Sequence, residues 1–203
     1  MKVYILDQTL ECENSKNQIE EIFKEINEKI SNNNVLFSHL IIDGSEVYGE
    51  FDNYILENIN QIKEIKVVTK TLKEVAQETL LSTLDYIERA NPEIEALSNE
   101  FYKTPEINTW KKLTELIEGI NWIMSTFTYI DSNPNLKNIV ISYENWNLYA
   151  KDIYSLKELI VEFEEIMENG DLVSLADILS YEIVPLFNSM KDKLETLVSQ
   201  GKN

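Results

Sequence analysis

Cysteine, histidine and arginine each occur only once in this sequence, as Cys12, His39 and Arg89. A lone cysteine cannot form an internal disulfide or build a thiolate metal cage, which excludes a disulfide scaffold and fits a reducing cytoplasm. Catalysis by a histidine base would have to use His39, because the chain offers no second histidine. The chain therefore offers one imidazole and one thiol to metal or nucleophilic chemistry.

Sequence motifs of the common enzyme classes are also missing. No HExxH, CxxC, GxGxxG, GxSxG or GxxxxGK[ST] pattern occurs, so zinc, dinucleotide, α/β-hydrolase and P-loop chemistries lose their usual support. No DxDxDG loop provides a calcium site, and the many glutamates lie mostly on the solvated faces of predicted helices. We therefore expect no cofactor and no metal.

Long apolar runs are absent as well. The apolar run after Met1 ends at Leu6, which is too short for the core of a signal peptide. No later stretch reaches the roughly 18 apolar residues that a membrane-spanning helix needs. We expect a cytoplasmic protein that does not enter a membrane.

Basic residues are few, and the 36 acidic residues outnumber the 18 basic ones to give a formal net charge of −18. Such a surface repels phosphate backbones and anionic lipid headgroups, so we expect neither nucleic acid nor membrane as a partner. Mimicry of nucleic acid is an alternative, although the lysines spread among the acids match it poorly. The near absence of arginine beside abundant isoleucine and asparagine indicates an AT-rich bacterial genome.

Hydrophobic periodicity changes several times within residues 1–70. Short apolar runs predict strands, whereas apolar residues three and four positions apart predict helices. Asp43-Gly44 suits a tight hairpin turn between the second and third strands. The order β-α-β-β-α-β is that of a ferredoxin-like module, in which two helices cover one face of a four-stranded antiparallel sheet. Strands are expected at Lys2–Leu6, Val35–Ile42, Ser45–Tyr48 and Glu64–Thr69, and helices from Ser15 to Ile30 and at Asp52–Ile62.

Residues 71–203 keep helical spacing and predict an all-α bundle, so the whole chain is predicted to be α+β. The only glycines before the tail of this region are Gly119 and Gly170, and the second marks a helix end. Helices are expected at Leu72–Ala90 and Pro92–Tyr102, from Thr104-Pro105 to about Ile130, from a break near Ser142–Asn145 to Asn169, and from Asp171 onward with a kink at Pro185.

Two acidic residues interrupt the apolar faces of the predicted helices. Asp152 falls in phase with Leu148 and Leu156, and Glu182 with apolar residues of the last helix. A carboxylate that faces a core must find a partner or take up a proton. Arg89 is one candidate partner; a lysine pair, or a helix rotated toward solvent, is the structural alternative. Asp152, Glu182 and His39 are thus the candidate catalytic residues, with His39 expected on the same strand face as the residues two positions away.

Trp122 and Tyr129 lie seven residues apart, opposite the apolar stripe of their helix. Such a helix is either covered on both sides or presents its aromatic residues to a partner. If exposed, the pair matches the tryptophan and tyrosine anchors of protein interfaces. We therefore predict Trp122 and Tyr129 as partner-binding residues.

Two functional hypotheses remain. The first is a non-catalytic interaction or adaptor protein that binds another protein, or itself, through apolar helix faces rimmed by acid. The second is an enzyme or small-ligand binder with a carboxylate-containing site between the two domains, 1–70 and 71–203. The missing motifs and the long amphipathic helices favour the first hypothesis.

Overall fold

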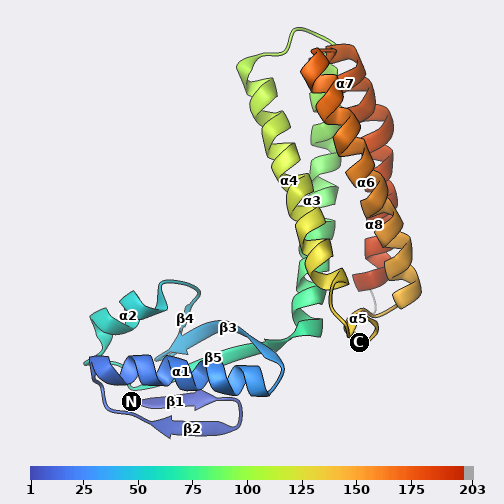
Figure 1. The fold of residues 1–203 in the computed structure, drawn as a ribbon. Coiled ribbons are helices and arrows are strands. Elements are labelled where there is room, and N and C mark those ends of the chain that lie inside the picture. The colour runs from blue at the N-terminus through green and yellow to red at the C-terminus, as the bar shows by residue number, and fades with distance from the viewer. Residues whose placement is uncertain (199–203) are drawn as a thin grey trace. The chain divides into compact units, whose positions relative to one another are not determined.

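The computed structural model describes residues 1–198, and the chain divides into two compact units, Met1–Val75 and Ala76–Asn203 (Figure 1). The first unit carries a sheet with two helices, and the described part of the second is helical. The predicted α+β class is confirmed. Within residues 1–198, none of the helices combines the length and the apolarity needed to cross a membrane.

The sheet of the first unit has five strands in the order β2-β1-β5-β3-β4. Strands β1 and β5 run parallel, and the other neighbouring pairs are antiparallel. The sheet is therefore mixed, and it has one strand more than the four-stranded antiparallel sheet that the sequence predicts. The strands are β1 (Lys2–Ile5), β2 (Gln8–Glu11), β3 (Val35–Ile42), β4 (Ser45–Val47) and β5 (Glu64–Thr71).

The additional strand, β2, lies at one edge of the sheet and turns back on β1. Only Leu10 of this strand is partly buried, so the sequence shows no apolar alternation there. The turn before it places Leu6 at φ 51°, where asparagine or glycine is the usual signal. In the predicted hairpin between β3 and β4, by contrast, Asp43 and Gly44 adopt φ 48° and 87°.

One face of the sheet is covered by α1 (Lys16–Asn32) and α2 (Phe51–Asn58), and Figure 1 shows α1 lying over the strands. Because strand side chains alternate between faces, every second residue of the central strands reaches these helices. The result is a one-sided core. Its buried residues are Val3, Ile5, Ile19, Ile22, Ile26, Ile30, Leu40, Ile42, Ile55, Ile62, Ile65 and Val67.

A bulge in β3 decides which face His39 occupies. Ser38 is an extra residue between the pairs that Phe37 and His39 make with β5. The extra residue reverses the alternation of side chains between the two faces of the sheet. Phe37 packs against the core before the bulge, and Leu40 is the residue that enters the core after it. The prediction that His39 shares a face with Val35 and Phe37 is therefore wrong.

In the described part of the second unit, four long helical segments pack side by side and alternate in direction (Figure 1). The fourth segment is composite, because a π-helical turn, η1, separates α7 from α8. The elements are α3 (Leu72–Phe101), α4 (Ile107–Asp131), α5 (Leu136–Ile139), α6 (Tyr143–Asn169), α7 (Leu172–Ile178), η1 (Leu179–Ile183) and α8 (Val184–Val198).

Helix α3 runs without a break through Pro92, although the sequence predicts two helices that meet there. Proline lacks an N–H and normally interrupts a helix. Here Ile87, Ile94 and Phe101 keep one helical phase, and all three are buried. Packing along this face outweighs the lost hydrogen bond, and Pro92 itself is exposed.

The predicted kink at Pro185 takes the form of the π-helical turn η1. The N–H of Val184 donates to the carbonyl of Leu179, five residues earlier. A π-helical turn accommodates an extra residue and so rotates the side chains that surround it. Ile183 therefore takes the inward position and is fully buried, whereas Glu182 faces solvent.

Several helix ends and polar side chains of the second unit form hydrogen bonds locally or with neighbouring helices. Gly170 ends α6 at φ 67°, and Asp171 caps α7 by accepting the N–H of Ser174, as the sequence predicts. The indole N–H of Trp146 donates to Asp131 over 2.8 Å and so ties α6 to the end of α4. Such directional links set the register of helices that otherwise meet through apolar side chains.

Glu100 on α3 forms a polar link to α4. The Lys112 ammonium binds one carboxylate oxygen, and the Thr109 hydroxyl donates to the other over 2.7 Å. These hydrogen bonds, that from Lys112 first, lower the pKa of the Glu100 carboxyl below its ordinary 4.5. Because the folded pKa is depressed, the link stabilises the fold above about pH 4.5 and is lost as the pH falls through the folded pKa.

Glu100→Gln should lower the free energy of unfolding near pH 7, and the difference from the wild type should shrink below about pH 4.5. Urea denaturation at about pH 7, 5 and 3 measures this dependence. Glu95→Gln, at an exposed position on the same helix, is the matched control. If the variant is less stable than the wild type by the same free energy at all three pH values, the ionised Glu100 carboxylate is not the source of the stabilisation.

Gly119 in α4 makes room for the ring of Tyr86 on α3. A Cβ atom at position 119 would lie 1.7 Å from Tyr86 Oη and 2.2 Å from Cζ. Protein interiors do not tolerate such distances, so the two side chains could not both occupy these positions. The ring of Tyr86 therefore lies directly against α4.

Gly119→Ala should destabilise the protein by about 1–2 kcal/mol, because overpacking costs more than the gain in helix propensity returns. In a Tyr86→Ala background the same change should be stabilising, since the steric conflict is gone. Urea denaturation of the wild type, both single variants and the double variant measures the coupling. If Gly119→Ala stabilises the protein equally with and without the Tyr86 side chain, the position of the tyrosine ring does not require a glycine at position 119.

Candidate interaction surface on helices α3 and α4

Asp152, one of the candidate catalytic residues, is engaged in the bundle interior. The residue is 8% exposed, and Lys193 on α8 donates to both of its carboxylate oxygens over 2.6 Å. The Ser189 hydroxyl donates over 2.9 Å. Asp152 thus links α6 to α8. Its partner is Lys193 and not Arg89, which pairs with Asp85 on its own helix over 2.9 Å.

Glu182 does not face the core, contrary to the helical-phase prediction, because η1 rotates it outward. It lines an open hollow of about 550 Å³ beside Glu158, Glu162 and Tyr181. Asp152 does not line this hollow, and no described contact joins the two carboxylates. The structure therefore does not bring these two candidate residues together.

His39 belongs to the first unit, on the sheet face opposite the core. Its ring stacks on Tyr48 with ring centroids 4.5 Å apart, and its Nδ1 lies 3.0 Å from the Ser38 hydroxyl. Tyr48 donates to Glu46 over 2.7 Å, and this hydrogen bond raises the pKa of Tyr48. His39 is thus part of a small polar and aromatic cluster of its own unit.

Trp122 and Tyr129 are both exposed, at 39% and 57%. Helix α4 is therefore not covered on both sides. Trp122 meets Tyr86 edge to face, with ring centroids 6.2 Å apart. Tyr129 follows two turns further along the same side of α4.

A hollow of about 570 Å³ opens beside Trp122, between α3 and α4. Its walls combine aromatic, aliphatic and charged groups, among them the only arginine of the chain. We use the name α3/α4 surface for this hollow together with Tyr129. The hollow is lined by Leu81, Ser82, Asp85, Tyr86, Arg89 and Trp122.

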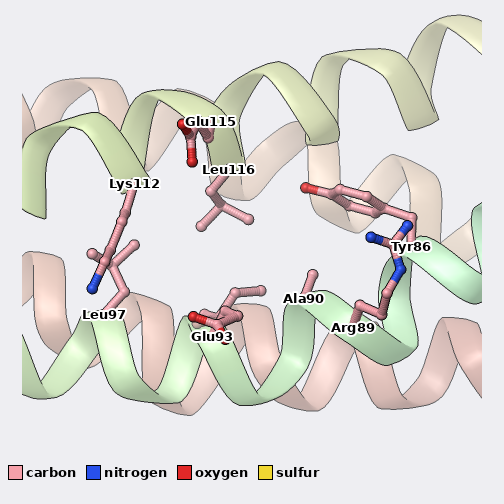
Figure 2. A pocket seen from close by; sticks show the side chains of 9 residues that line it. Tyr86, Arg89, Ala90, Glu93, Leu97, Lys112, Glu115 and Leu116 are labelled. Carbon is pink, nitrogen blue, oxygen red and sulfur yellow. The ribbon is translucent and has the colours of Figure 1, made fainter. Parts of the chain in front are cut away.

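A second cavity, of about 350 Å³, adjoins the hollow and shares Tyr86 and Arg89 with it. In Figure 2, Lys112 and Leu97 close one end, while Tyr86 and Arg89 close the other. We call this space the Tyr86 cavity. Nine of the described residues line it, namely Tyr86, Arg89, Ala90, Glu93, Ile94, Leu97, Lys112, Glu115 and Leu116.

The hydroxyl group of Tyr86 is partly removed from solvent. Burial raises the pKa of its hydroxyl, and the nearby Arg89 charge opposes the shift. The phenol is therefore neutral at physiological pH and serves as a hydrogen-bonding and packing group.

The α3/α4 surface combines tryptophan, tyrosine and arginine side chains, and it adjoins the Tyr86 cavity. The residues that line the Tyr86 cavity include no histidine, cysteine or serine. Within residues 1–198, no group of three or more histidine, cysteine or acidic side chains could hold a metal. Tryptophan, tyrosine and arginine are, in contrast, the side chains that most often dominate binding energy at protein interfaces.

The sequence indicated that Trp122 and Tyr129 could be exposed, but it did not indicate that Tyr86 and Leu81 lie beside Trp122. Tyr86 lies on the inward side of α3, where an aromatic residue is read as core. One available signal was Gly119, a glycine inside a helix, which often marks a position where another group approaches closely.

Replacement of Lys193 tests the structural role of Asp152. Lys193→Met should lower the free energy of unfolding by about 2–4 kcal/mol, because it leaves a largely buried carboxylate without its counter-ion. Adding Asp152→Asn should recover part of this loss. Urea denaturation measures both, with the exposed Lys157→Met as control. If Lys193→Met changes the free energy of unfolding by less than about 0.5 kcal/mol, the Asp152–Lys193 pair does not stabilise the bundle.

Comparison with known proteins found family matches for both units. Residues 1–71 match the family model described as the TP0873 N-terminal domain. Residues 78–193 match a domain of unknown function, DUF8042. Comparison with curated proteins gave no match, and comparison with solved structures gave none. Because the second family model covers more than half of the chain, this protein belongs to the DUF8042 family.

Proposed function

We propose that the protein is a non-catalytic interaction protein and that the α3/α4 surface binds its partner. The observation that carries this proposal is the pair of adjoining hollows between α3 and α4, bordered by exposed Trp122 and by Arg89. Interface anchors are typically tryptophan, tyrosine and arginine side chains beside pockets that exclude water. Tyr129 extends the same side of α4.

The partner is proposed to be a different protein. Two copies of a chain with a formal net charge of −18 repel each other, which opposes self-association. The single cysteine supports a cytoplasmic location for the encounter.

A carboxylate-containing catalytic site has less support. Asp152 is occupied by Lys193 and Ser189, and these contacts account for its burial without a reaction. Glu182 is exposed and makes no contact with Asp152 among the described residues. Neither carboxylate therefore has the environment of a general acid or base poised for chemistry.

The double variant Trp122→Ala/Tyr129→Ala should lose most of the captured partner, about tenfold or more, because truncation of interface aromatics typically costs 1–2 kcal/mol each. Affinity capture from extracts of the source cell with quantitative mass spectrometry measures the loss. The melting temperature should fall by no more than about 3 °C, since both side chains are exposed.

Tyr154→Ala/Tyr181→Ala is the matched control, because these tyrosines are 58% and 70% exposed elsewhere on the second unit. It should retain the partner. Equal capture by the wild type and by the Trp122/Tyr129 variant would contradict the proposal. So would size-exclusion chromatography in which that variant only converts a dimer of this chain to a monomer.

A further inference from the structure

The Tyr86 cavity places two carboxylates on opposite sides of an apolar floor. In Figure 2, Glu115 projects from α4 and Glu93 from α3, with Leu116 between them and Ala90 beside Glu93 in the direction of Tyr86. Ile94 completes the floor and is buried. An occupant must therefore offer an apolar stem to the floor and a polar or charged end to the two sides.

The two cations at the ends of the cavity are already balanced by other acids. Arg89 is held by Asp85 over 2.9 Å. Lys112 is bound to Glu100, and this hydrogen bond, with a smaller contribution from the charge of Glu93, raises the pKa of Lys112. Arg89 makes two close contacts with Asp85, since its Nε also donates over 3.1 Å, and Lys112 makes a direct hydrogen bond to Glu100. Each cation therefore has a close acidic partner that does not line the cavity.

The two carboxylates have weaker partners. Glu93 forms no ion pair with any described residue. Glu115 pairs with Lys111 over 3.5 Å, which is a longer contact than the 2.9 Å between Arg89 and Asp85, and exposed pairs of this kind contribute little. Among the four charged side chains that line the cavity, the two carboxylates therefore have the more distant counter-ions, and a cationic ligand can approach them.

We infer that the Tyr86 cavity receives a lysine or arginine side chain of the partner, with its stem on Leu116 and Ala90 and its cationic head between Glu93 and Glu115. This inference rests on the proposed function and defines the chemistry of the partner. Lysine and arginine bury an aliphatic stem while the charged end stays hydrated, which matches a floor and rim of this kind.

Size and charge agree with this occupant. A volume of about 350 Å³ lies at the lower end of the range of ligand pockets, which suits a single side chain. The net charge of −18 attracts a cationic segment over a distance and speeds its encounter. A neighbouring apolar side chain of the same segment would enter the hollow beside Trp122.

Hexylamine, hexanol and hexanoate share one apolar stem and differ in charge, so they serve as probes of the cavity. Amide chemical shifts of α3 and α4 in the full chain measure each affinity. Hexylamine should bind at least about fivefold more tightly than hexanol, and hexanoate more weakly than either. Glu93→Gln/Glu115→Gln should abolish the preference for the amine.

Glu164→Gln/Glu165→Gln is the matched control, because it removes the same charge from exposed positions on α6 and should keep the preference. Equal binding of hexylamine and hexanol to the wild type would overturn the inference. So would tightest binding of hexanoate, shifts with none of the three probes, or an amine preference that survives in Glu93→Gln/Glu115→Gln.

The inference and the proposed function fail in distinguishable ways. If the cavity takes a basic side chain, Glu93→Gln/Glu115→Gln should weaken capture of the partner about tenfold. If capture depends on Trp122 and Tyr129 but not on these glutamates, the cationic side chain is excluded and the proposed function stands. If capture depends on neither pair, both are overturned.

Discussion

The contact between Tyr86 and the glycine at position 119 governs how α3 and α4 face each other. No side chain at Gly119 competes with the tyrosine ring, so the ring lies directly against α4. Tyr86 is also the wall that the hollow beside Trp122 shares with the Tyr86 cavity. One packing contact therefore divides the space between two helices into two adjoining recesses. A larger residue at position 119 would push the ring into one of them.

Polar groups of the bundle serve its architecture at most of the positions where they are buried. Asp152 joins α6 to α8 through Lys193, and Glu100 joins α3 to α4. Apolar packing alone permits several rotations and shifts of neighbouring helices, whereas these directional contacts select one. The acids that remain without a close counter-ion lie at the surface, where a partner can reach them. That division explains why a strongly acidic chain folds into a compact bundle and still presents negative charge at its surface.

The sheet of the first unit is buried on one face only. Helices α1 and α2 cover the alternate residues of the central strands. The bulge at Ser38 shifts β3 by one residue, which places His39 beside Tyr48 on the other face. A histidine that looks isolated in the sequence thereby gains an aromatic neighbour from the residue that follows β4, in the same hairpin. The bulge leaves no trace in the apolar pattern, because both sides of β3 carry apolar residues.

The sequence by itself determined which segments form helices and most of the strands, where Asp43-Gly44 turns, and where Gly170 and Asp171 separate α6 from α7. These features depend on local periodicity, left-handed turn residues and caps, which neighbouring residues specify. It also indicated that Trp122 and Tyr129 lie away from the apolar stripe of α4. It did not reveal β2, whose single apolar residue at an exposed edge gives no pattern.

Tertiary structure alone decided the continuity of α3 through Pro92, the outward rotation of Glu182, and the face of His39. In each case packing of a buried face outweighed a local preference, or one extra residue changed the phase that a regular helix or strand would keep. The pairing of Asp152 with Lys193 and the meeting of Tyr86 with Gly119 join residues of different helices. Contacts between residues so far apart in the chain leave no periodic signal, because only the folded arrangement of the helices brings them together.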